Sequence, residues 1–252
     1  MITKSEIQLV RSLADKRART DTGLFLAEGE KLIRELRASD LRIERIYALD
    51  GLFSGPEVTP VSPKEMERLS HLKTPGSSLA LVRMPHRDLR SADPAAGLVL
   101  ALDDVQNPGN MGTIIRLADW FGIGDIVCSE ATADCFNPKV VQATMGAILR
   151  VRVHYTDLGR YLAAHAAAGI PVYGTFLDGE DLYRADLTPA GIVVMGNEGR
   201  GVRPATAAGI TRRLYIPPFP ADRAGSESLN VAMAAGVVCA EFRRRMRRAR
   251  AP

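Results

Sequence analysis

The fold class is decided by the stretch Leu98-Val99-Leu100-Ala101-Leu102, in which five apolar residues follow one another without polar alternation. A second run of this kind, Ile192-Val193-Val194-Met195, lies further along the chain. Strands that are apolar on both faces are typical of parallel sheets covered by helices. We therefore predict an α/β fold with a mostly parallel sheet, whose ligands bind at the loops following the strands.

Predicted strands and helices alternate regularly through the second half of the chain. The strands are 98–102, 125–128, 151–155, 172–176, 192–195 and 213–216, and the helices are 111–120, 138–149, 157–168 and 229–245. An amphipathic helix is predicted over 4–19. Two prolines, mixed charge and small residues over 84–97 indicate a linker. We predict one α/β domain over 1–90 and a second over 98–252.

The charge is unevenly distributed along a chain of ordinary globular composition. Of 252 residues 46% are hydrophobic and 25% charged, and the formal net charge is +4. The segment 243–250 holds six arginines and no acid, which leaves 27 basic residues against 29 acidic ones elsewhere. This basic tail favours a nucleic-acid partner, although a solvated helix end that suits the helix dipole explains it as well.

No metal site or exported protein is indicated. Cys128, Cys135 and Cys239 form no CxxC pair, and the four histidines lack metal-ligand spacing. The N-terminus has no apolar signal-peptide core, so we expect a cytoplasmic protein.

Three loops that follow predicted strands carry unusual residues. In the first, Asn107-Pro108-Gly109-Asn110, turn chemistry is a sufficient explanation, with Asn110 able to cap the next helix. Arg116 lies almost two helical turns later between apolar neighbours, where a guanidinium could hold a phosphate or carboxylate. In the second, Gly196-Asn197-Glu198-Gly199-Arg200-Gly201, three glycines permit positive φ and close ligand approach. This pattern is neither GxGxxG nor a P-loop, so a structural turn is its alternative.

The third loop runs from Ile216-Pro217-Pro218-Phe219 to Ser228-Leu229-Asn230-Val231-Ala232. Ser228 can cap the last helix, and Asn230 falls in its first turn. Small residues continue through Gly236, which indicates tight packing of this helix.

Together these loops resemble the three motifs of the SpoU/TrmH-like RNA 2′-O-ribose methyltransferases, of the SPOUT superfamily. The resemblance spans about Leu98 to Arg243. The stretch Phe25–Leu32 is similar to the small α/β RNA substrate-binding domain that precedes many of these enzymes.

The resemblance implies S-adenosylmethionine as methyl donor, a deep trefoil knot in the C-terminal part of the sheet, and a homodimer formed through the knotted domain. The catalytic residues it implies are Asn110, Arg116, Glu198, Ser228 and Asn230. The cofactor-binding residues it implies are Thr175, Gly196, Asn197, Gly201, Ile216, Pro217, Ser228 and Leu229.

Structured RNA is the implied partner, and the N-terminal domain favours ribosomal RNA over tRNA. The residues expected to contact RNA are Lys4, Arg11, Lys16, Arg17, Arg19 and Arg116. We interpret Arg116 as a phosphate clamp and not as a base, because an arginine side chain stays protonated at pH 7. A tRNA methyltransferase, a non-catalytic RNA-binding relative and an unrelated nucleotide-binding enzyme are the alternatives.

Overall fold

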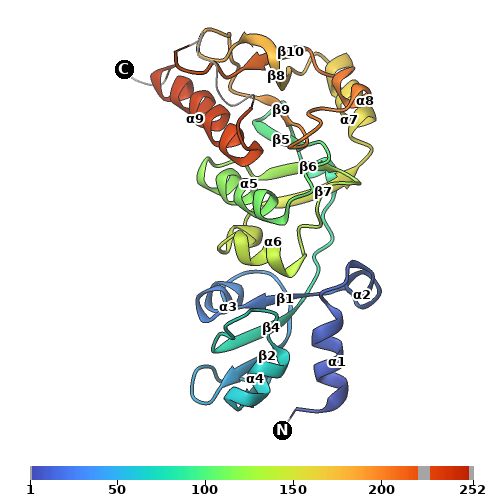
Figure 1. Cartoon of the computed structure of the whole chain (residues 1–252), viewed down its shortest axis with the longest axis vertical. Coiled ribbons are helices and arrows are strands. Elements are labelled where there is room, and N and C mark those ends of the chain that lie inside the picture. The colour runs from blue at the N-terminus through green and yellow to red at the C-terminus, as the bar shows by residue number, and fades with distance from the viewer. Residues whose placement is uncertain (1, 221–227, 250–252) are drawn as a thin grey trace. The chain divides into compact units, whose positions relative to one another are not determined.

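A computed structural model describes residues 2–220 and 228–249, except for the side chains of 247–249 (Figure 1). The chain divides into two compact units. The first comprises Met1–His86 and Asp134–Leu149, and the second comprises Arg87–Ala133 and Arg150–Pro252. Within the described ranges, no helix is long and apolar enough to cross a membrane.

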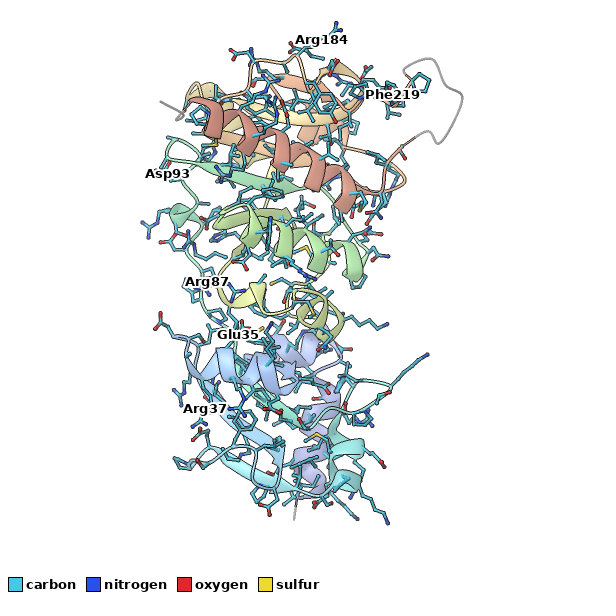
Figure 2. The ribbon with its side chains drawn as sticks, turned by 90° about the vertical axis from the view of Figure 1, so that its left-hand side faces the viewer. Glu35, Arg37, Arg87, Asp93, Arg184 and Phe219 are labelled. Carbon is cyan, nitrogen blue, oxygen red and sulfur yellow. The ribbon has the colours of Figure 1, made fainter. Side chains whose placement is uncertain are left out.

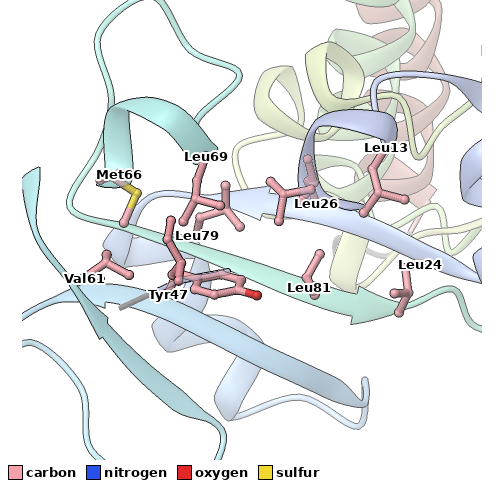
Figure 3. Close-up of a cluster of buried hydrophobic side chains, with 11 residues drawn as sticks. Leu13, Leu24, Leu26, Tyr47, Val61, Met66, Leu69, Leu79 and Leu81 are labelled. Carbon is pink, nitrogen blue, oxygen red and sulfur yellow. The ribbon is translucent and has the colours of Figure 1, made fainter. Parts of the chain in front are cut away.

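The first unit is built on a four-stranded sheet with the strand order β1-β4-β2-β3, in which only β2 and β3 run parallel. Its elements are α1 (Lys4–Ser12), α2 (Lys16–Thr22), β1 (Leu24–Glu28), α3 (Glu30–Arg37), β2 (Ile43–Leu49), β3 (Val58–Val61), α4 (Pro63–Leu69), β4 (Ser78–Arg83), α6 (Pro138–Ala143) and the 3-10 helix η2 (Ala147–Leu149). Figure 3 shows its core, where Leu26, Tyr47 and Leu81 of the sheet meet Met66 and Leu69 of α4.

The single helix predicted over 4–19 is two helices in the structure, so that prediction is wrong. Arg19 supplies the physical reason. Its buried guanidinium donates hydrogen bonds to the carbonyls of Leu13 and Ala14, at 2.7 and 3.0 Å, just after α1 ends. Its Nη2 also lies 2.5 Å from Asp134 Oδ2. Asp15 then begins α2 by accepting a hydrogen bond from the Arg17 amide.

The segment Asp134–Leu149 belongs to the first unit although it comes from the middle of the chain. Its α6 packs on β1, and the ring centroids of Phe25 and Phe136 lie 4.7 Å apart. The predicted helix over 138–149 is shorter in the structure, because α6 ends at Ala143 and only η2 follows.

The second unit contains a six-stranded sheet with the order β10-β8-β9-β5-β6-β7, and all its neighbouring strands are parallel. Its elements are η1 (Leu89–Ser91), β5 (Leu98–Leu102), α5 (Pro108–Trp120), β6 (Asp125–Ser129), β7 (Arg152–Thr156), α7 (Leu158–Ala167), β8 (Val172–Asp181), β9 (Gly191–Met195), α8 (Pro204–Ala207), β10 (Arg212–Tyr215) and α9 (Val231–Ala249). The α/β fold with a mostly parallel sheet is confirmed.

Strand order reverses direction at the centre of this sheet. From β5 the chain proceeds outward through β6 to β7, whereas from β9 it leaves on the other side toward β10 (Figure 1). Ligands of open α/β sheets bind at the carboxyl ends of strands where such connections diverge. The topology therefore selects the loops after β5 and β9 as the place to look for a site.

The last helix, α9, packs against α5. A Cβ added at Gly236 would lie 3.6 Å from both methyl carbons of Leu117 in α5. Phe242 is buried near the other end of the apolar face, and its ring meets that of Tyr173 edge-on at 5.1 Å. The 3.6 Å distance at Gly236 is ordinary van der Waals contact, so the packing of α9 on α5 does not itself require glycine at that position, and the prediction of tight packing through small residues stays a prediction.

Candidate active site

The loop after β5 begins α5 with a cap that differs from the prediction. Asn107, not Asn110, is the N-cap, because its Oδ1 accepts hydrogen bonds from the amides of Gly109 and Asn110 at 2.8 and 3.1 Å. Pro108 occupies the first helical position, where its missing N–H costs nothing. The side chain of Asn110 is therefore left available for contacts with other loops.

Three predicted catalytic residues meet in one chain of hydrogen bonds. Asn230 Nδ2 donates to Asn110 Oδ1 at 3.0 Å, and Asn110 Nδ2 donates to Glu198 Oε1 at 2.8 Å. These contacts join positions 120 and 88 residues apart in the sequence. The loops after β5, β9 and β10 thus converge on the half-buried Asn110.

Asn230 fixes the direction of this chain. Its Oδ1 accepts hydrogen bonds from the amides of Ala232 and Met233, at 3.0 and 3.3 Å, and so caps α9. Its Nδ2 is then left to donate to Asn110. The Asn110 side-chain amide in turn donates to the Glu198 carboxylate. The prediction that Ser228 caps this helix is wrong, because α9 begins only at Val231 and the adjacent Asn230 fills the role.

The glycine-rich turn after β9 is closed on itself. Asn197 and Gly201 exchange both main-chain hydrogen bonds at 2.9 Å, with φ of +69° at Gly201. A Cβ at Gly196 would lie 2.4 Å from the Gly201 carbonyl carbon and 2.5 Å from the Val202 nitrogen, so only glycine fits there. This close approach presents Glu198 at the exposed tip of the turn.

Two buried acids clamp that turn to the loop after β5. Asp103 is fully buried, and its carboxylate accepts hydrogen bonds from the Arg203 amide and Nε, both at 2.8 Å. Asp104 has a left-handed φ of 60°; its carbonyl accepts from Asn197 Nδ2 at 2.7 Å, and its Oδ2 lies 3.1 Å from Arg200 Nη2. The hydrogen bond and charge of Asp103 raise the pKa of Arg203 above its ordinary value.

Sequence reasoning missed Asp103, Asp104 and Arg203. The available signal was the pair of adjacent acids directly after an apolar strand, since buried carboxylates require charged or hydrogen-bonding partners. The partners themselves lie 96 and 100 residues away and carry no local signal.

The remaining predicted catalytic residues lie at the surface. Arg116 is exposed on α5, and within the described part of the chain no hydrogen bond or ion pair is found for it. Ser228 is exposed in the segment that leads into α9.

The predicted cofactor residues lie near the carboxyl ends of three neighbouring strands. Thr175 in β8 donates a hydrogen bond to the Val194 carbonyl of β9 at 3.3 Å. Ile216 and Pro217 follow β10 and are half-buried, whereas Leu229 is 53% exposed. The loop after β10 then reaches the surface, where Phe219 projects outward and is 94% exposed (Figure 2).

The basic residues of the first unit that were expected to contact RNA differ in their exposure. Lys4, Arg11, Lys16 and Arg17 are exposed, and Arg11 Nε donates to the Arg68 carbonyl at 2.8 Å. Arg19 is buried and paired with Asp134, so we withdraw it from the expected RNA contacts. Among the described residues, no group of three or more His, Cys, Asp or Glu side chains could hold a metal ion.

Comparison with known proteins identifies the family. The sequence pattern of the SpoU rRNA Methylase family matches residues 97–240. The chain belongs to this SpoU family. The pattern of the MRM3-like substrate binding domain matches residues 4–80 of the same chain.

Relatives of this SpoU-family protein match most of its length. The 23S rRNA (guanosine(2553)-2′-O)-methyltransferase RlmP of Bacillus subtilis is 32% identical over 240 residues, which is 92% of this chain and 94% of the relative. A 23S rRNA (guanosine-2′-O-)-methyltransferase RlmB of Acinetobacter baylyi is 32% identical over 214 residues, 80% of this chain and 84% of the relative.

Solved structures of the family agree with the fold. A Porphyromonas gingivalis protein described as a TrmH-family RNA methyltransferase is 39% identical with a TM-score of 0.89, covering 97% of this chain and 99% of that one. An AdoMet-bound rRNA methyltransferase from Sinorhizobium meliloti is 28% identical with a TM-score of 0.87, covering 98% and 97%.

Proposed function

We propose that this protein is an S-adenosylmethionine-dependent RNA 2′-O-ribose methyltransferase acting on ribosomal RNA. The observation that carries the proposal is the hydrogen-bonded chain Asn230–Asn110–Glu198, which joins the three loops bearing the SpoU motifs. RlmP and RlmB, named as 23S rRNA 2′-O-methyltransferases, match the chain over most of its length.

The residues present fit S-adenosylmethionine. Apart from Gly201 and its two chain neighbours, no atom of the described residues lies within 4 Å of the position of a Cβ at Gly201, which leaves space beside the main chain there. Ile216, Pro217 and Leu229 offer apolar surface of the kind that holds an adenine, and Thr175, Asn197 and Ser228 offer polar groups. With Gly196 and Gly201 these side chains would hold the cofactor. When bound, S-adenosylmethionine supplies a methyl group carried on a sulfonium sulfur.

Arg116 would hold a phosphate of the substrate RNA and so orient the ribose 2′-oxygen. Its guanidinium is exposed and always protonated, which suits a phosphate ligand and not a proton acceptor. Holding the nucleophile in line with the methyl group is a large part of what such a site contributes to the rate. Asn110, Glu198, Ser228 and Asn230 would complete the hydrogen bonds around the substrate.

The first domain, over residues 1–90, would bind the RNA substrate, and 98–252 would carry out the transfer. The match to the MRM3-like substrate binding domain over 4–80 supports this division. Lys4, Arg11, Lys16 and Arg17 would contribute RNA contacts there. Membership of the SpoU family also underlies our proposals of a trefoil knot, a homodimer through the second domain and a cytoplasmic location.

The decisive experiment compares the wild-type protein with Arg116→Ala. Calorimetry should give S-adenosylmethionine affinities for the two proteins within about twofold, because Arg116 serves the RNA. Methyl transfer should fall at least a hundredfold, since one charge-assisted bidentate contact is worth roughly 1.5–3 kcal/mol and its loss also misaligns the nucleophile.

The target RNA is found by mapping. Ribose methylation sites in ribosomal RNA and tRNA of a deletion strain are compared with those of the parent by blocked reverse transcription. Loss of one ribosomal site supports the proposal, and loss of a tRNA site corrects the substrate. Absence of S-adenosylmethionine binding by the wild-type protein would favour a non-catalytic RNA-binding relative.

A further inference from the structure

Arg200 is a charged residue of the glycine-rich turn that the proposed function leaves without a role. It lies two residues after Glu198, whose carboxylate is bound to Asn110. The side chain of Arg200 is 72% exposed, although its partner Asp104 is 7% exposed. One guanidinium nitrogen, Nη2, contacts Asp104 at 3.1 Å, so most of its N–H donors face solvent.

Stabilisation of the buried Asp104 accounts for only part of the Arg200 side chain. Asp104 is held in place independently of Arg200, because its Oδ1 accepts a hydrogen bond from Gln106 and its amide donates to Ser129 Oγ, both at 2.9 Å. The ion pair stabilises the buried Asp104 carboxylate but uses one guanidinium nitrogen of Arg200. Arg200 is therefore available to exchange Asp104 for another anion.

The turn fixes the main chain of Arg200 and places small residues beside it. The Arg200 amide donates to Asn197 Oδ1 at 3.0 Å, which fixes the base of the side chain. On either side stand glycines. Among the described residues other than its chain neighbours, a Cβ at Gly199 would meet nothing closer than Asn197 Oδ1 at 3.8 Å, and one at Gly201 would meet nothing within 4 Å. The 72% exposure of the Arg200 side chain makes its guanidinium accessible to a phosphate.

We infer that Arg200 binds a backbone phosphate of the RNA, next to the ribose that is methylated. A ribose within an RNA chain is flanked by two phosphates. Arg116 on α5 and Arg200 on the glycine-rich turn both present exposed guanidinium groups. These two elements meet at the hydrogen bond between Asn110 and Glu198. Asp104 holds the Arg200 side chain in position until RNA replaces one of its contacts. This inference rests on the proposed function and adds a second phosphate ligand to it.

The test measures RNA binding by the full-length protein, using ribosomal RNA from a strain that lacks the gene. Affinities are measured by filter binding without S-adenosylmethionine over a range of KCl concentrations. Arg200→Ala should weaken binding about tenfold or more at low salt, and the slope of log affinity against log salt should fall by roughly 0.7–0.9, the value for one phosphate contact. Arg200→Lys should lose less, since it keeps the charge.

Two controls separate this role from a structural one. Arg184→Ala removes an arginine that is 87% exposed and projects from the same unit, 3.7 Å from Asp181, and it should leave affinity and slope unchanged (Figure 2). Asp104→Asn removes the partner charge but keeps the Gln106 contact and a residue that tolerates positive φ. It should lower RNA affinity much less than Arg200→Ala does.

The outcomes are distinct. Unchanged RNA affinity of Arg200→Ala would overturn the inference, as would equal losses in Arg200→Ala and Asp104→Asn, which would assign Arg200 a structural role. A loss of S-adenosylmethionine affinity without loss of RNA affinity would place Arg200 on the cofactor and also overturn it. Failure of the proposed function would be seen differently, as absence of methyl incorporation by the wild-type protein.

Discussion

At the scale of single residues, Asn110 determines whether the three motif loops act together. Its amide oxygen accepts a hydrogen bond from Asn230 and its amide nitrogen donates one to Glu198, so a single short side chain connects both partners. Its backbone is already held by Asn107 at the start of α5. The side chain therefore orients Glu198 and Asn230 without being needed for helix formation.

Asn110→Ala should consequently lower activity much more than stability. We expect methyl transfer to fall tenfold or more, because Glu198 and Asn230 lose their shared partner, while the free energy of unfolding changes by about 1 kcal/mol or less. Thr113→Ala is the matched control. Thr113 is exposed on the same helix, and its hydroxyl donates a hydrogen bond to the Gly109 carbonyl at 2.9 Å. Equal activity of the two variants would show that the hydrogen bonds linking Asn230, Asn110 and Glu198 are not required for methyl transfer.

At the scale of elements, the main chain of the glycine-rich turn restricts which residue fits at position 196. Gly196→Ala would force a Cβ to within 2.4 Å of Gly201, which cannot be relieved by rotating a side chain. We expect a loss of roughly 2–4 kcal/mol in urea unfolding. Gly199→Ala, where the nearest atom would be 3.8 Å away, should change stability by about 1 kcal/mol or less. Similar losses in both variants would disprove the close-approach argument.

The helix α9 contains a buried carboxylate whose contribution depends on pH. Hydrogen bonds from Arg244, and then from Arg245, lower the pKa of Glu241 to about 2 from its ordinary value of 4.5. A carboxylate with a lowered folded-state pKa stabilises the fold above the unfolded value, and this contribution is lost as pH falls from about 4.5 toward 2.

Glu241→Gln tests this directly. At pH 7 the free energy of unfolding should fall by roughly 1–3 kcal/mol, because the substitution removes the negative charge that Arg244 and Arg245 bind. Between pH 4.5 and 2 the difference between variant and wild type should shrink steadily. A difference that stays constant over this range in urea unfolding would mean that Glu241 does not titrate as described.

Elements also show how far the sequence could predict the molecule. The parallel sheet was predictable because Leu98–Leu102 and Ile192–Met195 are apolar on both faces. The break between α1 and α2 was not, because the Arg19 side chain that bonds the Leu13 and Ala14 carbonyls is buried and held by Asp134, 115 residues away. In the site, the motif residues Asn110, Glu198 and Asn230 could be named as a set. Their hydrogen bonds and the buried acids behind them depend on tertiary contacts that leave no local pattern.

At the scale of the whole molecule, the basic tail divides into two parts. Arg243 donates to the carbonyls of Phe121 and Gly122 at 2.6 and 3.1 Å, and Arg244 and Arg245 pair with Glu241. These three arginines belong to the fold. The side chains of Arg247, Arg248 and Arg250 lie outside the described residues. Truncation after Phe242 would therefore remove structural contacts together with charge, and it is a poor test of RNA attraction.

Deletion of residues 247–252 removes three arginines and leaves the contacts of Arg243, Arg244 and Arg245 in place. If the tail attracts RNA, the slope of log affinity against log salt should fall by about 2, because each phosphate contact contributes roughly 0.7–0.9. Replacing the same three arginines by lysines keeps the charge and should leave the slope unchanged. An unchanged slope after deletion would assign the tail to the helix dipole alone and leave the excess positive charge of this protein without a role in RNA binding.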